Sequence, residues 1–380
     1  MLVRICHVTT FWPNRFGHTH YTDALIKGIQ KKEVHQHVLA AEDPAHEIEE
    51  DGIRVKSCFK RSEDYVAGIT ETVRGFSPDV ALIQYTPDVF GSDGRLIRLV
   101  KSLEDIDVRT IVNAHSVYPG AKWDRFDREL ARVVSQIQVH SSRMKRDLLA
   151  RGVRDDKVTV IPHGSLIRPP IDRNEARRLL GIPISARVLL FFGFIWLGKG
   201  LDFLLSAFAD AAKEVPGAYL YLGGYVRHKY IYSLIYMHYL SARMRLLAIR
   251  DKTGMWGDYV PDDMVLPIFS ASDCVGMPYK QDYSSVSGVV HQAAGMDCPM
   301  ICSRISKFDE VGEGIDEDLL VPFGDRKAWA RTIARLLSDE AWAEEIRGKV
   351  RAFAQKTSWE NVGRQHLALY RSILAGTRNG

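Results

Sequence analysis

The chain has 380 residues, of which 46% are hydrophobic and 26% are charged, and its formal net charge is +4. The composition is that of a soluble globular protein, and the length favours two domains that each have their own core. The charge is too small to indicate nucleic-acid binding, and no run of eighteen apolar residues predicts a membrane span.

The N-terminus and the cysteines indicate the cellular compartment. The first residues, MLVRICHVTTFW, enter a β-like run at once and lack the small-residue cleavage site of a signal peptide. The five cysteines are sparse, and the C-x3-C pair of Cys298 and Cys302 has no second Cys/His pair to complete a zinc site. We therefore expect reduced thiols, no metal site and a cytoplasmic protein.

The first half of the chain alternates apolar, strand-like runs with helical patterns. The expected strands are 2–10, 37–40, 53–55, 80–84, 110–114, 136–139 and 158–161, and the expected helices are 21–29, 65–76, 94–103, 126–134 and 142–150. This alternation predicts a mostly parallel sheet with helices on both faces. Ligands of such sheets bind beyond the carboxyl ends of the strands, where 10–19, 85–86, His115 and His163 lie in the sequence.

The second half repeats the alternation after a break, because residues 167–173, IRPPIDR, contain two prolines in polar surroundings and predict a linker. Strands are expected at 187–192, 218–222, 274–277, 300–302 and 319–321, and helices at 173–180, 201–214, 326–337, 340–355 and 359–374. The fold class predicted is α/β, with two doubly wound domains that face each other across a cleft. Their expected ranges are 1–166 and 167–357, followed by a helical segment over 358–380.

Residues 278–306 combine a strand end, a serine-rich loop, a helical turn and another strand. The N-terminus of a helix has unpaired N–H groups and a partial positive charge, which favour a bound phosphate. The small residues Ser284, Ser285, Ser287 and Gly288 would let a phosphate approach the backbone closely. An ordinary capped helix is the alternative interpretation.

Three further residues are candidates for chemistry. The loop GFIWLGKG places Lys199 between two glycines where a strand meets a helix, so its ammonium and the helix end can meet one phosphate. It is not a Walker loop, since Gly200 stands where that motif requires a hydroxyl. His115 and His163 end strands in NAHS and IPHG, where a histidine either bonds a substrate hydroxyl or holds a loop carbonyl.

Residues 225–252 form a basic, tyrosine-rich segment. A basic amphipathic helix there would lie on an anionic membrane surface. The alternative is an ordinary helix with a solvated basic face.

Taken together, these motifs resemble glycosyltransferase family 4, the group 1 glycosyltransferases, which are retaining sugar transferases of the GT-B fold. The pieces that carry the resemblance are FWPNRFG, NAHS, VTVIPHG, GFIWLGKGLDFLLSAF, PYKQDYSSVSGVVHQAAGMDCPMICS and the SW pair at 358–359. The resemblance implies a Rossmann-like acceptor domain, a Rossmann-like donor domain and a last helix that crosses back to the first domain.

The resemblance also implies roles for single residues. Lys199 would hold the donor diphosphate, together with backbone N–H groups around Ser287 and Gly288. His115 would contact the transferred sugar, and Gly17 would lie beside the diphosphate.

The sequence departs from the family pattern at two kinds of position. The paired glutamates of the family fall on Ser284 and Gln292, and the amide of Gln292 can still bond the ribose hydroxyls. The basic residue that precedes the family's lysine falls near Phe194, so Arg227 or Lys229 is the expected replacement. Ser285 and Glu310 complete the expected donor site.

The implied activity is that of a glycosyltransferase of the hexosyltransferase type, which moves a sugar from a nucleoside-diphosphate sugar to a hydroxyl acceptor. The acceptor would be a glycan, a lipid-linked molecule or a small molecule, and no metal or other cofactor is expected. Peripheral contact with the inner membrane face is possible, and nucleic acid is not expected as a partner. The alternatives are a non-catalytic, nucleotide-sugar-binding pseudo-transferase and a sugar-nucleotide epimerase that uses Asp88, Asp282 and Glu310.

Overall fold

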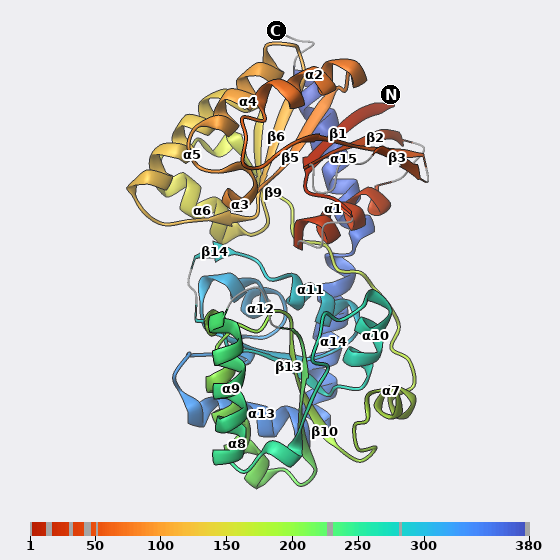
Figure 1. The fold of residues 1–380 in the computed structure, drawn as a ribbon, viewed down its shortest axis with the longest axis vertical. Coiled ribbons are helices and arrows are strands. Elements are labelled where there is room, and N and C mark those ends of the chain that lie inside the picture. Colours follow the sequence, from red (N-terminus) through yellow and green to blue (C-terminus); the bar gives the residue numbers. More distant parts are fainter. Residues whose placement is uncertain are drawn as a thin grey trace. The chain divides into compact units, whose positions relative to one another are not determined.

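The structure is a computed structural model, and it describes residues 2–12, 17–29, 33–41, 47–50, 52–225, 231–280 and 283–376. The chain folds into two compact units (Figure 1). Unit 1 consists of residues 1–164, 283–286 and 357–380, and unit 2 consists of residues 165–282 and 287–356. The short segment 283–286 therefore leaves unit 2 and joins unit 1, a feature that the sequence did not predict.

Unit 1 is built on an eight-stranded sheet with the order β3-β4-β2-β1-β5-β6-β8-β9. All neighbouring strands pair in parallel except β3 and β4. The predicted, mostly parallel sheet is thus confirmed, and the chain leaves β1 in both directions, as in a doubly wound sheet. The strands are β1 (Val3–Thr9), β2 (Val34–Ala41), β3 (Glu47–Glu50), β4 (Ile53–Phe59), β5 (Val80–Tyr85), β6 (Arg109–Ala114), β8 (Gln136–Val139) and β9 (Val158–Val160).

Helices cover both faces of this sheet (Figure 1). Alternate residues of β5 show the two faces, because Ala81 and Ile83 pack into one apolar cluster while Val80 and Leu82 pack into another. The first cluster lies under α2 (Val66–Phe76), α4 (Arg95–Glu104), α5 (Ala121–Val133) and α6 (Ser142–Ala150), and the second under α1 (Gly17–Gly28) and α15 (Trp359–Gly376).

The last helix, α15, belongs to unit 1 and packs against α1. A Cβ at Gly363 would collide with the carbonyl oxygen of Gly28, so the backbones of the two helices approach each other at these glycines. At the start of α15 the Trp359 ring lies against the Tyr21 ring, with the ring centroids 5.0 Å apart. The last helix of the chain is therefore part of the first unit.

Unit 2 is built on a six-stranded, fully parallel sheet with the order β12-β11-β10-β13-β15-β16. Its strands are β10 (Arg187–Phe192), β11 (Ala218–Gly223), β12 (Thr253–Met255), β13 (Cys274–Met277), β15 (Met300–Ser303) and β16 (Leu320–Val321). Its helices are α7 (Arg173–Leu180), α8 (Leu201–Glu214), α9 (Ile231–Leu246), α10 (Asp262–Ser270), α11 (Gly288–Gly295), α12 (Asp309–Gly314), α13 (Arg326–Ser338) and α14 (Glu340–Lys356).

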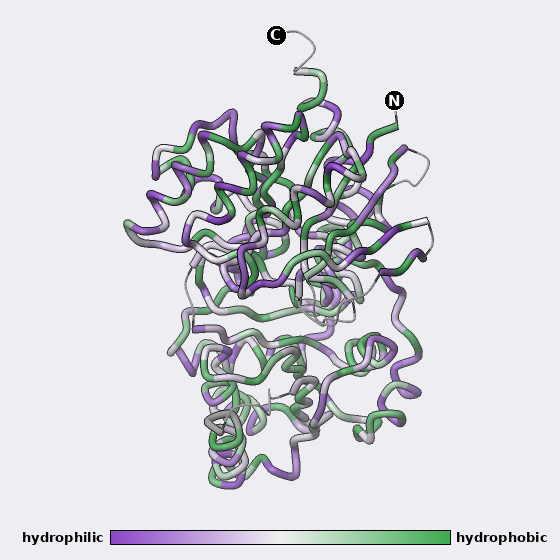
Figure 2. The backbone as a smooth tube through the Cα atoms, turned by 45° about the horizontal axis from the view of Figure 1, so that its top comes forward, coloured by the Kyte–Doolittle hydropathy of each residue, from purple (hydrophilic) through white to green (hydrophobic). Residues whose placement is uncertain are grey.

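Helical periodicity explains how the unit 2 helices attach to the sheet. Along α8, Leu204 and Phe208 lie four residues apart on one face, and both are fully buried in the core of the unit. The helices change between hydrophilic and hydrophobic colours along their length, as this one-sided burial requires (Figure 2).

The elements that the sequence analysis missed are short or interrupted. Strands β3 and β12 have few residues. Helix α10 contains Pro267, and a proline within a helical pattern usually predicts that the helix ends there. The strand expected at 319–321 begins one residue later, because Leu319 ends a 3₁₀ turn.

Candidate active site

Three neighbouring strands of unit 2, β10, β13 and β15, end at the same edge of the sheet. The loop after each of them carries a residue of interest: Lys199 after β10, Tyr279 after β13 and Lys307 after β15. The carboxyl edge of an open parallel sheet is the usual position of a ligand site.

The backbone around Lys199 is held against the loop that follows β13. Lys199 ends a 3₁₀ turn, Leu197–Lys199, and Gly200 after it has a φ of +65°. A Cβ at Gly200 would collide with the carbonyl oxygen of Pro278, and the Lys280 amide donates to the Gly198 carbonyl over 3.0 Å. Glycine is therefore required at position 200 for both the conformation and the close approach.

The side chain of Lys199 lies in an environment that favours an anion. Its ammonium nitrogen is 3.5 Å from the centroid of the Tyr279 ring, a cation–π contact. Burial lowers the pKa of Lys199 to about 7, and the charge of Lys307 contributes in the same direction. None of the residues that the structure describes contributes a carboxylate that forms an ion pair with this half-buried lysine.

Helix α11 begins at the same edge. Ser287 is its N-cap residue and makes no side-chain cap hydrogen bond, so its hydroxyl leaves the first N–H groups of the helix uncapped. The Tyr279 hydroxyl lies next to Ser287. Gly288, the first residue of α11, is exposed, and Gln292 lies half-buried one turn further on. The predicted group of Lys199, Ser287 and Gly288 therefore gathers in one unit.

Glu310 is fixed by one carboxylate oxygen only. Its Oε2 lies 3.3 Å from Nε2 of the buried His291, whose Nδ1 lies 3.0 Å from the Ser165 hydroxyl. The other oxygen, Oε1, is buried and has no hydrogen-bond partner within the described parts of the chain. A buried carboxylate oxygen normally accepts a hydrogen bond, so this atom can receive one from a ligand.

The structure assigns Ser284 and Ser285 to unit 1 rather than to the sheet edge of unit 2. They form the short strand β14 (Ser284–Ser285), which pairs antiparallel with β7 (Ser116–Val117). The Ser284 hydroxyl also donates a hydrogen bond to the Asp147 carboxylate. These two serines therefore lie beside the segment that follows His115.

In unit 1, His115 follows β6 and has protein partners at both ring nitrogens. Its Nε2 lies 2.8 Å from Oε1 of Gln84, and its Nδ1 lies 3.3 Å from Nε2 of His140. An amide oxygen only accepts, so the proton is assigned to Nε2 of His115, and Nδ1 then accepts from His140. Burial, with a smaller contribution from His18, lowers the pKa of His115 to about 3. His115 is therefore a neutral, oriented ring at pH 7.

The first turn of α1 contains one residue that the sequence analysis missed. Gly17 begins α1, and the next residue, His18, has its ring centroid 6.1 Å from that of His115. Burial lowers the pKa of His18 to about 4, against the raising effect of Asp88. The signal for His18 was its position in FGHTH, directly after the glycine that was selected.

The remaining predicted residues divide into two that are described, Asp88 and His163, and three that are not. His163 has its Nδ1 2.9 Å from the carbonyl oxygen of Gly164, which is the loop-holding alternative. Arg227, Lys229 and Asp282 lie outside the described residues.

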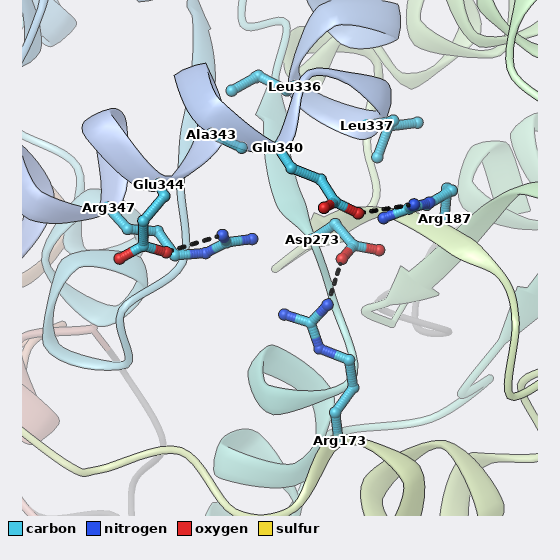
Figure 3. A pocket seen from close by; sticks show the side chains of 9 residues that line it. All are labelled: Arg173, Arg187, Asp273, Leu336, Leu337, Glu340, Ala343, Glu344 and Arg347. Atoms are coloured by element: carbon cyan, nitrogen blue, oxygen red, sulfur yellow. Dashed lines mark hydrogen bonds and ion pairs between the residues drawn. The ribbon is translucent and has the colours of Figure 1, made fainter.

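A pocket of about 340 Å³ lies at the opposite, amino edge of the unit 2 sheet (Figure 3). Its charges are already paired: Arg173 with Asp273 at 2.7 Å, and Arg187 with Glu340 at 3.1 Å. It contains none of the predicted site residues, and we interpret it as a structural ion-pair cluster. No three His, Cys, Asp or Glu side chains in the described ranges form a group suited to a metal ion.

Solved structures share the fold of this chain. The structure of Anabaena HepE in complex with UDP and glucose superposes with a TM-score of 0.76 at 16% identity, covering 97% of this chain and 100% of that one. Sucrose-phosphate synthase from Thermosynechococcus elongatus gives 0.77 at 18% identity, covering 98% and 100%. At these identities the likeness shows the fold alone, which is GT-B.

Family models match both units. Residues 186–339 match a model described as glycosyl transferases group 1, and residues 16–164 match a model described as a glycosyl transferase 4-like domain. Together the two matches cover most of the chain. The chain therefore belongs to the group 1 glycosyltransferases, glycosyltransferase family 4.

Curated relatives are named as glycosyltransferases. The D-inositol 3-phosphate glycosyltransferase of Corynebacterium urealyticum is 31% identical over 208 residues, which are 52% of this chain and 46% of that protein. The corresponding protein of Segniliparus rotundus is 28% identical over 254 residues, 65% of this chain and 54% of that protein. The chain thus spans about half the length of the curated relatives that it matches.

Proposed function

We propose that the chain is a retaining glycosyltransferase that moves a sugar from a nucleoside-diphosphate sugar to a hydroxyl acceptor without a metal ion. The observation that carries the proposal is Lys199, which lies half-buried on Tyr279 beside the start of α11 and without a carboxylate ion-pair partner among the described residues. The solved neighbour whose title names UDP and glucose supports a nucleotide-sugar donor.

The chemistry follows from the charge that develops in the reaction. The bond between the anomeric carbon and the diphosphate oxygen breaks, and its electron pair leaves with the diphosphate. The Lys199 ammonium and the α11 N–H groups stabilise this negative charge in the transition state. The acceptor oxygen bonds the anomeric carbon on the face that the diphosphate leaves, and a phosphate oxygen takes the acceptor proton. No side-chain nucleophile is needed.

Other residues would orient the donor. Glu310 Oε1 can accept a hydrogen bond from a sugar hydroxyl, while His291 holds the other oxygen of the carboxylate. Gln292 can bond the ribose hydroxyls through its amide. Because His115 is neutral and both its nitrogens are bonded, its proposed role is to shape the sugar site rather than to transfer a proton.

The decisive experiment is thermal stability of the full chain with UDP, GDP, ADP and their common sugar conjugates. Ligand at 100 times its dissociation constant should stabilise the folded state by about 2.7 kcal/mol. We expect one nucleotide to raise the unfolding midpoint, and Lys199→Ala to abolish the effect. Lys213→Ala is the matched control, because Lys213 is exposed on α8 and pairs with Asp210. A chain that responds to none of these ligands would rule out the sugar-transfer function.

Binding and turnover must then be separated, since a pseudo-transferase would also bind nucleotide. Turnover of the stabilising donor with an acceptor, or its hydrolysis without one, identifies an enzyme. Release of an isomerised sugar nucleotide with no free nucleoside diphosphate would instead identify an epimerase.

Helix α9 is the proposed place of peripheral membrane contact. Its buried face carries Tyr236, Leu240 and Met244, yet its opposite face is also largely apolar, with Ile235 62% and Leu246 83% exposed. Of the basic residues that the sequence analysis noted in this segment, Arg245 and Arg250 are exposed, whereas the guanidinium of Arg243 donates inward to the Ser206 hydroxyl at 2.7 Å. A surface helix that is apolar on both faces indicates a partner, and the exposed basic residues after it favour an anionic bilayer.

Vesicle sedimentation tests this contact. The native chain should bind vesicles that contain anionic phospholipid and not neutral ones, and a double Ile235→Glu, Leu246→Glu variant should lose binding. Leu179→Glu on α7 is the control, because Leu179 is 59% exposed on the same unit. Equal binding by the native chain and the double variant would refute the contact. In the described parts of the chain no helix is long and apolar enough to cross a membrane.

A further inference from the structure

Lys307 is a second cation at the carboxyl edge of the unit 2 sheet. It lies in the 3₁₀ turn Ser306–Phe308, between β15 and α12. Strand β15 neighbours β13, and β13 neighbours β10, so the loops that carry Lys307, Tyr279 and Lys199 follow one another along the edge.

Aromatic packing connects the two lysines. The residue after Lys307, Phe308, is fully buried and packs its ring on that of Tyr279, with centroids 5.2 Å apart. Tyr279 is the ring over which the Lys199 ammonium lies. The backbone positions of both lysines are therefore fixed relative to the same aromatic side chain.

The two ammonium groups lie close enough to repel each other. Burial lowers the pKa of Lys307 to about 8 despite the raising effect of Glu310, and its charge depresses the pKa of Lys199 in turn. Bringing two cations together in a partly desolvated site costs free energy, and a ligand with more than one negative charge removes that cost. A diphosphate fits this requirement better than a monophosphate, because its charge is spread over two phosphoryl groups.

We propose that Lys307 binds the same diphosphate as Lys199 and supplies the second positive charge of the donor site. This inference rests on the proposed function and names a residue that the motifs did not indicate. It replaces the expectation that Arg227 or Lys229 fills this role. With Lys199 and Lys307 on different loops, the pair selects a nucleoside diphosphate over the corresponding monophosphate.

Titration calorimetry of the full chain tests the inference with UDP, GDP and ADP and with the matching monophosphates. For the base that binds the native chain, Lys307→Ala should weaken diphosphate binding about tenfold or more and monophosphate binding less than about twofold. Lys307→Arg, which keeps the charge, should restore most of the affinity. Lys213→Ala should change neither value.

The outcomes separate this inference from the proposed function. If Lys199→Ala abolishes diphosphate binding and Lys307→Ala does not weaken it, the donor site stands and the role of Lys307 is wrong. Equal weakening of diphosphate and monophosphate by Lys307→Ala, without rescue by Lys307→Arg, would show that Lys307 only supports the local fold. If no nucleotide binds the native chain, the proposed function fails, and this inference fails with it.

Discussion

The two edges of the unit 2 sheet both collect charged residues, but they use them differently. At the amino edge, Arg173 and Arg177 bind the two oxygens of Asp273, so that cations and a carboxylate are in direct contact. At the carboxyl edge, Lys199 and Lys307 are cations that repel each other. The pocket of about 340 Å³ lies at the amino edge. We therefore base the proposed ligand site on the two neighbouring lysines of the carboxyl edge and not on the volume of the pocket at the amino edge.

The largest expected effect is at the amino edge and concerns stability. Asp273 is buried, and besides the two arginines it accepts from the backbone amide of Val188 at 2.7 Å. Replacing it leaves buried donors and the Arg177 charge without their partner, so Asp273→Ala should lower the free energy of unfolding by about 3–5 kcal/mol. Urea denaturation measures this. A loss below about 1 kcal/mol would show that the amino edge is not a structural cluster.

The second prediction concerns catalysis at the carboxyl edge. Lys199→Ala should reduce kcat/KM for the donor by about 10²- to 10³-fold, because the ammonium stabilises charge that develops on the leaving diphosphate. Arg187→Ala removes a cation of the same sheet, from an exposed ion pair at the other edge, and should leave kcat/KM within about twofold. Equal losses of kcat/KM in both variants would contradict the prediction that only the carboxyl edge takes part in catalysis. Initial rates with the donor identified by thermal stability provide the comparison.

The third prediction uses the pH dependence of the two lysines. Their pKa values of about 7 and about 8 in the ligand-free chain rise when a diphosphate binds, so diphosphate affinity should fall by about tenfold or more as pH rises from 7 to 9. Glu310 on α12 and His291 on α11 face the same site. Calorimetry across this range tests the trend, and Lys307→Ala should flatten it.

The fourth prediction concerns the free energy of unfolding of the ligand-free chain. The contribution of Lys199 to it should rise with pH, whereas the affinity for a diphosphate should fall. The pKa of Lys199 is lower in the folded chain than its value of 10.5 in the unfolded chain, so between about pH 7 and 10 the unfolded state binds more protons. The contribution of Lys199 to the free energy of unfolding therefore rises with pH. The native chain should gain stability relative to Lys199→Met over this range, and a constant difference would contradict the assigned environment.

The sequence was sufficient for features that depend on local pattern. Continuous apolar runs defined β10 and β13, and the glycines around Lys199 identified the turn between β10 and α8. Glycine was needed there because of backbone conformation and close approach, which are properties of the turn itself.

Features that depend on distant pairing were not accessible. Lys307 has no motif around it, and its loop lies at the carboxyl edge beside the loop of Tyr279 because β15 is placed beside β13. Ser284 was assigned by spacing to the donor site, but its strand pairs with β7, and both belong to unit 1. The Gln84 contact that fixes the tautomer of His115 joins residues of separate strand segments, β5 and the end of β6.

The smallest expected effect is on kcat/KM in a Glu310 variant. It tests whether the Glu310 carboxylate at the carboxyl edge accepts a hydrogen bond from the ligand. Glu310→Gln keeps an oxygen or nitrogen at each position but removes the charge, so a sugar hydroxyl would lose only part of its hydrogen bond. We expect kcat/KM to fall about fivefold, equivalent to roughly 1 kcal/mol, with an unchanged unfolding midpoint. Glu344→Gln at the amino edge, where Glu344 pairs with Arg347 at 3.3 Å, should change neither quantity. A lower unfolding midpoint with unchanged kcat/KM in Glu310→Gln would mean that Glu310 only holds His291, and the carboxyl edge would then rely on its cations alone.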